Sequence, residues 1–182
     1  NLKYSAKNMG WDLSHASRFV HVFDSLIKSK DILGLNFPTK EHLKKMSNQL
    51  VYATFNKNFK KPLFTNLMDG TNGWYRIGYS GRSGFGYGPW DMSYAVPTGG
   101  YGFWSIYNND IQTVFVSLVD MLKTNDPEIR RHVAEHYEKR HWNQYKRVKS
   151  SDFKKMEDPE TRSMLIKFLP SLCFMTMNIN GL

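Results

Sequence analysis

The chain has 182 residues, a hydrophobic content of 41% and a formal net charge of +9. That length suits one domain with a real core, and no apolar run is long enough to span a membrane. The single cysteine, Cys173, excludes an intrachain disulfide, and its place in an apolar run predicts a buried, chemically quiet thiol.

Two helices are expected in the first third of the chain. Asp12 can cap a helix over 13–29, whose apolar residues recur at helical spacing and make one buried face. The Asn-Phe-Pro-Thr stretch at 36–39 breaks the chain, and Thr39 can cap a second helix over 39–56. We expect the two helices to pack as an antiparallel hairpin.

Residues 58–107 differ in kind from the rest of the chain. They hold 10 of the 13 glycines and 13 aromatic residues, but only six charged residues. A segment of this length without a clear period is usually functional or disordered, and its aromatic content argues against disorder. We expect an ordered, ligand-facing loop with short strands near 74–79 and 101–106.

Three further helices are expected over 109–123, 127–146 and 158–169. Asn109 or Asp110 can cap the first, and the other two begin with Asp-Pro pairs, in which Asp is the cap and Pro occupies the first turn. The sequence therefore predicts a single, mainly α domain over 1–182, built of antiparallel helical hairpins around the long glycine- and aromatic-rich loop.

The first group of candidate functional residues lies at the start of the first helix. His15 and Arg18 are three positions apart, so a helix projects both on one side, and Trp11 adds an aromatic wall. A histidine near a guanidinium suits a base that works near neutral pH, while the cation stabilises charge on a substrate carboxylate. The alternative is a capped helix start with a hydrogen-bonded histidine and a surface arginine.

The second group is the aromatic loop. Sugars present flat C–H faces that stack on Trp and Tyr, and hydroxyl rims that need Asn, Asp and Arg, while glycine lets the backbone approach closely. The alternative is a rigid loop packed over the core. Asp91 is the better of the loop's two carboxylates for acid–base chemistry, because it lies in the most crowded part. The other candidates are Arg76 and Tyr87 for catalysis, and Trp74, Tyr75, Tyr79, Trp90, Tyr101 and Trp104 for substrate contact.

A third group is histidine-rich. His132 and His136 are four positions apart, a spacing that can ligate a metal on a helix, with His141 nearby. Position 133 is Val, so the pattern is not His-Glu-x-x-His, and the density of charge predicts an exposed helix face. We expect neither a metal nor another cofactor.

The helix–helix–loop organisation resembles the (α/α) toroid enzymes that act on polysaccharides: lyases of uronic-acid polymers, related glycoside hydrolases and uronyl epimerases. Residues 12–15, Asp-Leu-Ser-His, look like the Asp-x-Ser-His that opens an inner helix in some of these enzymes. Residues 88–94, Gly-Pro-Trp-Asp-Met-Ser-Tyr, look like a cleft loop of that class. The resemblance implies the C-terminal portion of a larger toroid, whose remaining helices lie upstream in the same chain.

The resemblance also implies roles. Toroid lyases use a group that neutralises the uronate carboxylate, a base and a Tyr acid. Candidates for these roles match by residue type, not by a full motif: Arg18 or Arg76, then His15, then Tyr75, Tyr79 or Tyr87.

Three functions remain open. The first is a carbohydrate-active lyase or hydrolase acting on a polysaccharide or oligosaccharide, an acidic one for preference, in a secreted or periplasmic setting. The second is a non-catalytic carbohydrate-binding or scaffold helical domain. The third is a nucleic-acid-binding helical domain, indicated by the net charge and the basic cluster at 139–149. Because the charge is spread along the chain, nucleic acid is disfavoured as a partner, and no membrane is expected.

Overall fold

The computed structural model describes residues 10–75, 85–138 and 143–144. Helices make up most of its regular structure, and the mainly α class expected from the sequence is confirmed. No helix in these ranges is both long and apolar enough to cross a membrane. The helix expected over 158–169, the thiol of Cys173 and the basic side chains of 139–149 lie outside the described residues.

The first expected helix is present, in pieces. α1 (Leu13–Ala16) begins at Asp12, whose carboxylate accepts hydrogen bonds from the backbone N–H groups of Ser14 and His15. α2 (Arg18–Lys28) follows after Ser17, and the short α3 (Lys30–Leu33) ends at a glycine with φ of 63°. That left-handed conformation is the usual helix C-cap and favours glycine. The cap predicted at Asp12 is therefore confirmed.

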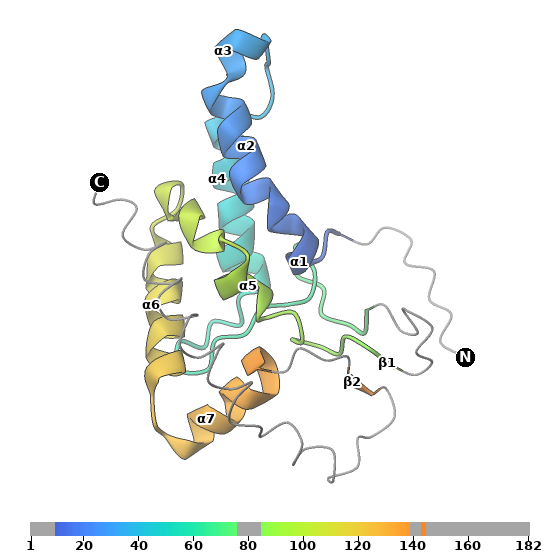
Figure 1. Cartoon of the computed structure of the whole chain (residues 1–182), viewed down its shortest axis with the longest axis vertical. Coiled ribbons are helices and arrows are strands. Elements are labelled where there is room, and N and C mark those ends of the chain that lie inside the picture. The colour runs from blue at the N-terminus through green and yellow to red at the C-terminus, as the bar shows by residue number, and fades with distance from the viewer. Residues whose placement is uncertain (1–9, 76–84, 139–142, 145–182) are drawn as a thin grey trace.

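The second expected helix consists of α4 (Lys40–Gln49) and the π-helical turn η1 (Leu50–Thr54). Thr39 caps it as predicted, in a capping box completed by the His42 side chain. In Figure 1, α2 and α4 lie side by side and project as an arm from the remainder of the chain, with α3 at its far end. The buried carboxylate of Asp24 ties this arm to the centre of the molecule, because it accepts a hydrogen bond of 2.9 Å from Tyr107 Oη.

The described parts of the aromatic segment hold short elements. β1 (Phe85–Gly86) pairs antiparallel with β2 (Asn143–Gln144), and an isolated bridge joins Tyr75 to Tyr87. Two stretches are helical: α5 (Ala95–Thr98) and the 3-10 helix η3 (Tyr101–Ile106). The short strand predicted near 101–106 is therefore wrong. The strand predicted near 74–79 is described only at 74–75, where Tyr75 forms its bridge.

The two described helices after the aromatic segment begin where the sequence predicted them to begin. α6 (Asp110–Lys123) buries one face, and α7 (Pro127–Val133) begins at Asp126, which caps it with proline in the first turn. The π-helical turn η4 (Ala134–Glu138) continues α7. The helix predicted to run to 146 is wrong at its end, because residues 143–144 extend to pair with β1.

The core joins the helical parts to the aromatic segment. Its largest fully buried side chains include Trp104, Tyr101, Tyr137, Phe64, Phe115 and Leu13. Because Leu13 is one of them, the start of α1 is held against the loop, and its backbone N–H donates to the carbonyl of Asn66 at 3.0 Å. This packing positions the candidate site.

Candidate functional site

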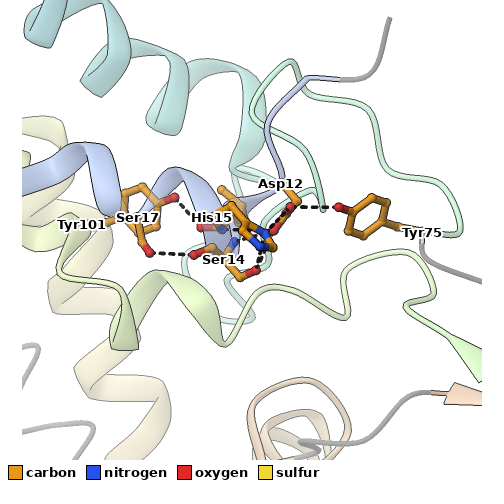
Figure 2. Close-up of polar contacts among 7 residues, drawn as sticks. Asp12, Ser14, His15, Ser17, Tyr75 and Tyr101 are labelled. Carbon is orange, nitrogen blue, oxygen red and sulfur yellow. Dashed lines mark hydrogen bonds and ion pairs between the residues drawn. The ribbon is translucent and has the colours of Figure 1, made fainter. Parts of the chain in front are cut away.

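The candidate site is centred on the carboxylate of Asp12, which is only 4% exposed. Its Oδ1 accepts the backbone N–H groups of Ser14 and His15, both at 3.1 Å, and the Ser14 hydroxyl at 2.6 Å. Its Oδ2 lies 2.6 Å from Nδ1 of His15 and accepts the Tyr75 hydroxyl at 3.0 Å. Figure 2 shows Tyr75 reaching from the loop to Asp12, on the side opposite Tyr101. One buried group thus joins the helix start to the aromatic loop.

The surroundings of Asp12 favour its charged form. Burial alone would raise the pKa of this carboxyl, but hydrogen bonds from Ser14, the His15 backbone, Tyr75 and the His15 ring lower the pKa below its ordinary value of 3.8. The sequence identified Asp12 as a helix cap, and the bond to Tyr75 adds a second role that no local pattern indicated.

His15 is half-buried and Arg18 is exposed. They lie on successive helices, because α1 ends at Ala16 and α2 begins at Arg18. The His15 side chain is 27% exposed, so its ring can meet a ligand while its Nδ1 faces Asp12. Arg18 is exposed at the start of α2. Trp11 is 60% exposed and packs edge-on against Phe19, with ring centroids 5.0 Å apart. The first group of predicted residues therefore occupies one end of the α1–α2 segment.

Two asparagines that sequence reasoning missed hold the loop in shape. The buried side chain of Asn66 donates to the carbonyls of Gly73 and Gly88, at 3.1 and 2.8 Å, and accepts the N–H of Met92 at 3.0 Å. Asn72 Oδ1 accepts the N–H of Trp90 at 2.8 Å. The available signal was weak: an asparagine before glycine at 72–73 indicates a turn, not a clamp on residues far along the chain.

The loop packs closely around Gly88. A Cβ placed there would lie 3.2 Å from Asp91 Oδ2 and 3.4 Å from the Trp74 ring, so a larger residue would require these side chains to shift slightly. Asp91 Oδ2 accepts the Gly88 N–H at 2.6 Å. The carboxylate proposed for acid–base chemistry is therefore engaged in shaping the turn. Trp74 is 38% exposed beside it.

Trp90 has a φ of 69°, in the left-handed region that a bulky side chain rarely adopts. Its N–H is held by Asn72 and its carbonyl accepts the N–H of Ser93 at 3.0 Å, so the surrounding loop fixes this conformation. Such strain persists only where neighbouring contacts impose it, and it is common at functional sites.

Two predicted substrate-contacting residues belong to the core instead. Tyr101 and Trp104 are both 0% exposed, and their rings pack edge-on at 5.2 Å. Tyr101 Oη donates to the carbonyl of Leu13 at 2.6 Å. Neither ring has a face open for stacking on a sugar, so this part of the prediction is corrected: both rings belong to the core, and Tyr101 supports the helix start through its hydroxyl. Arg76 and Tyr79 lie outside the described residues.

The remaining loop aromatics meet at the bridge between Tyr75 and Tyr87. Each backbone N–H donates to the other's carbonyl at 2.8 Å, and the ring centroids lie 6.4 Å apart. Both side chains are half-buried. The bridge places the Tyr87 ring beside Tyr75, whose hydroxyl donates to Asp12.

The histidine-rich stretch is less exposed than its charge indicated. His132 is buried, and its ring centroid lies 4.8 Å from that of His136. The expectation of an exposed helix face is wrong for His132 because α7 turns this side of the helix to the core, where Val133 and Tyr137 are also buried. Within the described ranges, no group of three or more metal-ligating side chains is placed to hold an ion.

The structure also has an open hollow of about 700 Å³ at the corner between α6 and α7. Its walls come from the 58–61 turn and from both helices, and include Phe59, Lys60 and Asp120. None of the predicted site residues lines it. We do not place the site here, because the converging polar groups of the chain lie around Asp12.

Comparison with known proteins found no match among family models, curated proteins or solved structures. The function is therefore inferred from the geometry around Asp12 and His15.

Proposed function

We propose that this chain acts on a carbohydrate, an acidic polysaccharide or oligosaccharide, and that His15 takes up the proton in the reaction. One observation carries the proposal. Asp12 Oδ2 meets both His15 Nδ1, at 2.6 Å, and the Tyr75 hydroxyl, at 3.0 Å. A partly exposed histidine backed by a buried carboxylate is an arrangement suited to general base chemistry, and here it adjoins a loop rich in aromatic residues.

The charge of the surroundings favours an acidic sugar over a neutral one. The chain carries a net charge of +9, and Arg18 is exposed three positions after His15. A guanidinium forms strong paired hydrogen bonds with a carboxylate. Trp11 and Trp74 offer partly exposed aromatic faces for the sugar rings. These features together support a uronate-containing ligand.

The reaction that fits these groups is β-elimination from a uronate. His15 removes the proton from the carbon next to the carboxylate, and the electron pair forms a carbon–carbon double bond. The glycosidic oxygen leaves with its bonding electrons and takes a proton from an acid, for which Tyr87 is the candidate. Arg18 stabilises the negative charge that develops on the carboxylate. Hydrolysis with Asp91 as acid is the competing reaction within the same proposal.

The proposal includes a place for the chain in an (α/α) toroid. The support is the neighbouring pair α2 and α4, joined through α3, and the following pair α6 and α7. Paired helices joined by short connections are the repeating unit of that architecture, with the aromatic segment on the ligand side.

The test is a panel of acidic and neutral oligosaccharides with the wild-type protein and His15→Asn. Asparagine keeps a donor near the position of Nδ1 for Asp12 but lacks Nε2. We expect turnover of an acidic substrate, followed by absorbance of the new double bond, to fall by about 10²- to 10⁴-fold in the variant. Binding measured by calorimetry should change little.

Three other outcomes of the oligosaccharide panel would each identify a different function or contradict the proposal. New reducing ends without a double bond would indicate hydrolysis. Binding of acidic sugars without turnover by the wild-type protein would indicate a non-catalytic carbohydrate-binding domain and contradict the assignment of His15. No binding of any sugar would contradict the proposal as a whole.

A further inference from the structure

The Asp12 carboxylate is saturated with donors. Described residues bring five contacts to it: Oδ1 meets two backbone N–H groups and the Ser14 hydroxyl, and Oδ2 meets His15 Nδ1 and the Tyr75 hydroxyl. An ionised carboxylate offers about four lone-pair sites on its two oxygens and can only accept. The backbone N–H groups can only donate. The two backbone N–H groups and the hydroxyls of Ser14 and Tyr75 all donate to these oxygens and already fill the four sites, so Asp12 is a charged acceptor with no proton to give to the His15 ring.

This saturation fixes where the hydrogen of the His15 ring lies. In the 2.6 Å contact between Nδ1 and Oδ2, the carboxylate is the acceptor, so Nδ1 carries the hydrogen. In the neutral ring, Nε2 then carries the lone pair. We propose that Asp12 is the positioning residue of this site: it locks His15 in the Nδ1–H tautomer, so that the ring takes up the substrate proton at Nε2.

Three further contacts make the lock rigid. The backbone N–H groups of Ser14 and His15 hold Oδ1 in the cap geometry of α1, which fixes the orientation of the carboxylate and leaves Oδ2 facing the imidazole. The Tyr75 hydroxyl binds Oδ2 from the opposite side, and the Tyr75 backbone is itself paired with Tyr87 at 2.8 Å in both directions. The loop and the helix start therefore hold the same carboxylate, one through each oxygen.

The inference rests on the proposed function for its ligand, but the lock itself is a property of His15. It can be measured without substrate by ¹⁵N NMR of protein labelled at histidine, because nitrogens with and without hydrogen have well-separated shifts. His15→Asn identifies the His15 signals by their loss. In the wild-type protein, at a pH where the ring is neutral, we expect hydrogen on Nδ1 and a lone pair on Nε2.

Asp12→Asn is the decisive variant. Asparagine caps a helix about as well as aspartate, so α1 should form, but its amide can donate to the ring nitrogen as well as accept from it. We expect the Nε2–H tautomer to become the major species. With substrate, kcat should fall on the order of 10²-fold while KM changes little, as for loss of a correctly placed base. Circular dichroism checks that the fold is kept.

The matched control is Asp126→Asn. Asp126 caps α7 through the same two backbone N–H positions, but it is exposed, and none of the described histidine rings bonds to its carboxylate. This variant should keep both the wild-type tautomer and the wild-type turnover. Tyr75→Phe should keep the Nδ1–H tautomer, since Asp12 remains, and so separates the lock from the loop contact.

The lock and the proposed function can fail separately. An Nε2–H tautomer in the wild-type protein, or an unchanged tautomer in Asp12→Asn, overturns the lock even if acidic sugars are turned over. If the tautomer changes as expected but no sugar is bound or processed, the lock stands and the proposed function fails.

Discussion

Two helices in this chain begin in the same way and lie in different surroundings. Asp12 and Asp126 each accept hydrogen bonds from the backbone N–H groups two and three residues ahead. Asp126 is exposed, whereas Asp12 is buried and also meets the Ser14 hydroxyl, the His15 ring and the Tyr75 hydroxyl. The same local motif thus ends a loop at the surface in one region and centres a buried polar network in the other. We therefore expect the contribution of a cap to stability to depend on its surroundings as well as on its own geometry.

The comparison is tested most strongly by removing each carboxylate. Asp12→Ala removes the cap and leaves the Tyr75 hydroxyl and the His15 ring without their acceptor, so we expect the free energy of unfolding to fall by about 3 kcal/mol. Asp126→Ala removes a cap at the surface, and a loss of about 1 kcal/mol is expected. Urea unfolding followed by circular dichroism measures both. Equal losses would show that the network around Asp12 adds nothing to the cap.

The contact between the helix start and the loop is tested by removing the Tyr75 hydroxyl. Tyr75→Phe removes one hydrogen bond to a buried, charged acceptor, and we expect a loss of about 1.5 kcal/mol in the free energy of unfolding. Tyr52→Phe is the matched control, since Tyr52 also donates to a carboxylate, that of Asp110 at 2.5 Å, but is exposed. Its removal should leave the unfolding curve unchanged. A similar loss in both variants would contradict the importance of burial.

The loss of unfolding free energy at acid pH tests the Asp12 cap of α1 further. The pKa of Asp12 is lowered in the folded protein from 3.8, so its contribution is present above pH 3.8 and is lost as pH falls through the folded pKa. Each unit of lowering corresponds to about 1.4 kcal/mol. Asp12→Asn should therefore show a flatter decline in unfolding free energy below pH 3.8. An unchanged slope would mean that Asp12 binds its proton equally in the folded and unfolded states.

The stability contributed by His132 of α7 should change at a higher pH than that contributed by Asp12, and this effect should be the smallest of those predicted. Burial lowers the pKa of His132 from its ordinary value of 6.5; Lys61 lowers it further, while the Pro62 carbonyl and Glu135 oppose the shift. Stability from the neutral ring is present above pH 6.5 and is lost as pH falls through the folded pKa. His132→Gln should flatten the pH dependence just below 6.5, as followed by thermal unfolding. A slope identical to that of the wild-type protein would assign the titration to another group.

The two caps also illustrate which features of the fold could be predicted from the sequence. The helix starts at Asp12, Thr39 and Asp126 were predictable, because a cap is a hydrogen bond between a side chain and backbone two or three residues away. The end of the last described helix was not, because residues 143–144 follow a pairing with β1, more than fifty positions earlier in the chain. The stretch at 101–106 was predicted as a strand but forms a 3-10 helix, whose Tyr101 and Trp104 pack into the core.

The candidate site also has features that the sequence could predict and features that it could not. Helix spacing alone put His15 and Arg18 together, and composition alone selected the aromatic loop. Neither could show that Tyr101 and Trp104 lie in the core while Trp11 and Trp74 reach the surface, since all four are aromatic residues and burial depends on what packs against them. The sequence could not predict the hydrogen bonds that Asn66 makes to the loop, because its partners include Gly88 and Met92, 22 and 26 positions away.

The sequence by itself determined the mainly α class, the three caps and the existence of an unusual aromatic segment, because these depend on period, composition and hydrogen bonds between near neighbours. The tertiary structure decided which of those features meet. Tyr75 and Asp12 are 63 positions apart, and they meet where the buried Leu13 and its backbone bond to Asn66 hold the helix start against the loop. Burial then strengthens every hydrogen bond at that point, because water no longer competes for the carboxylate.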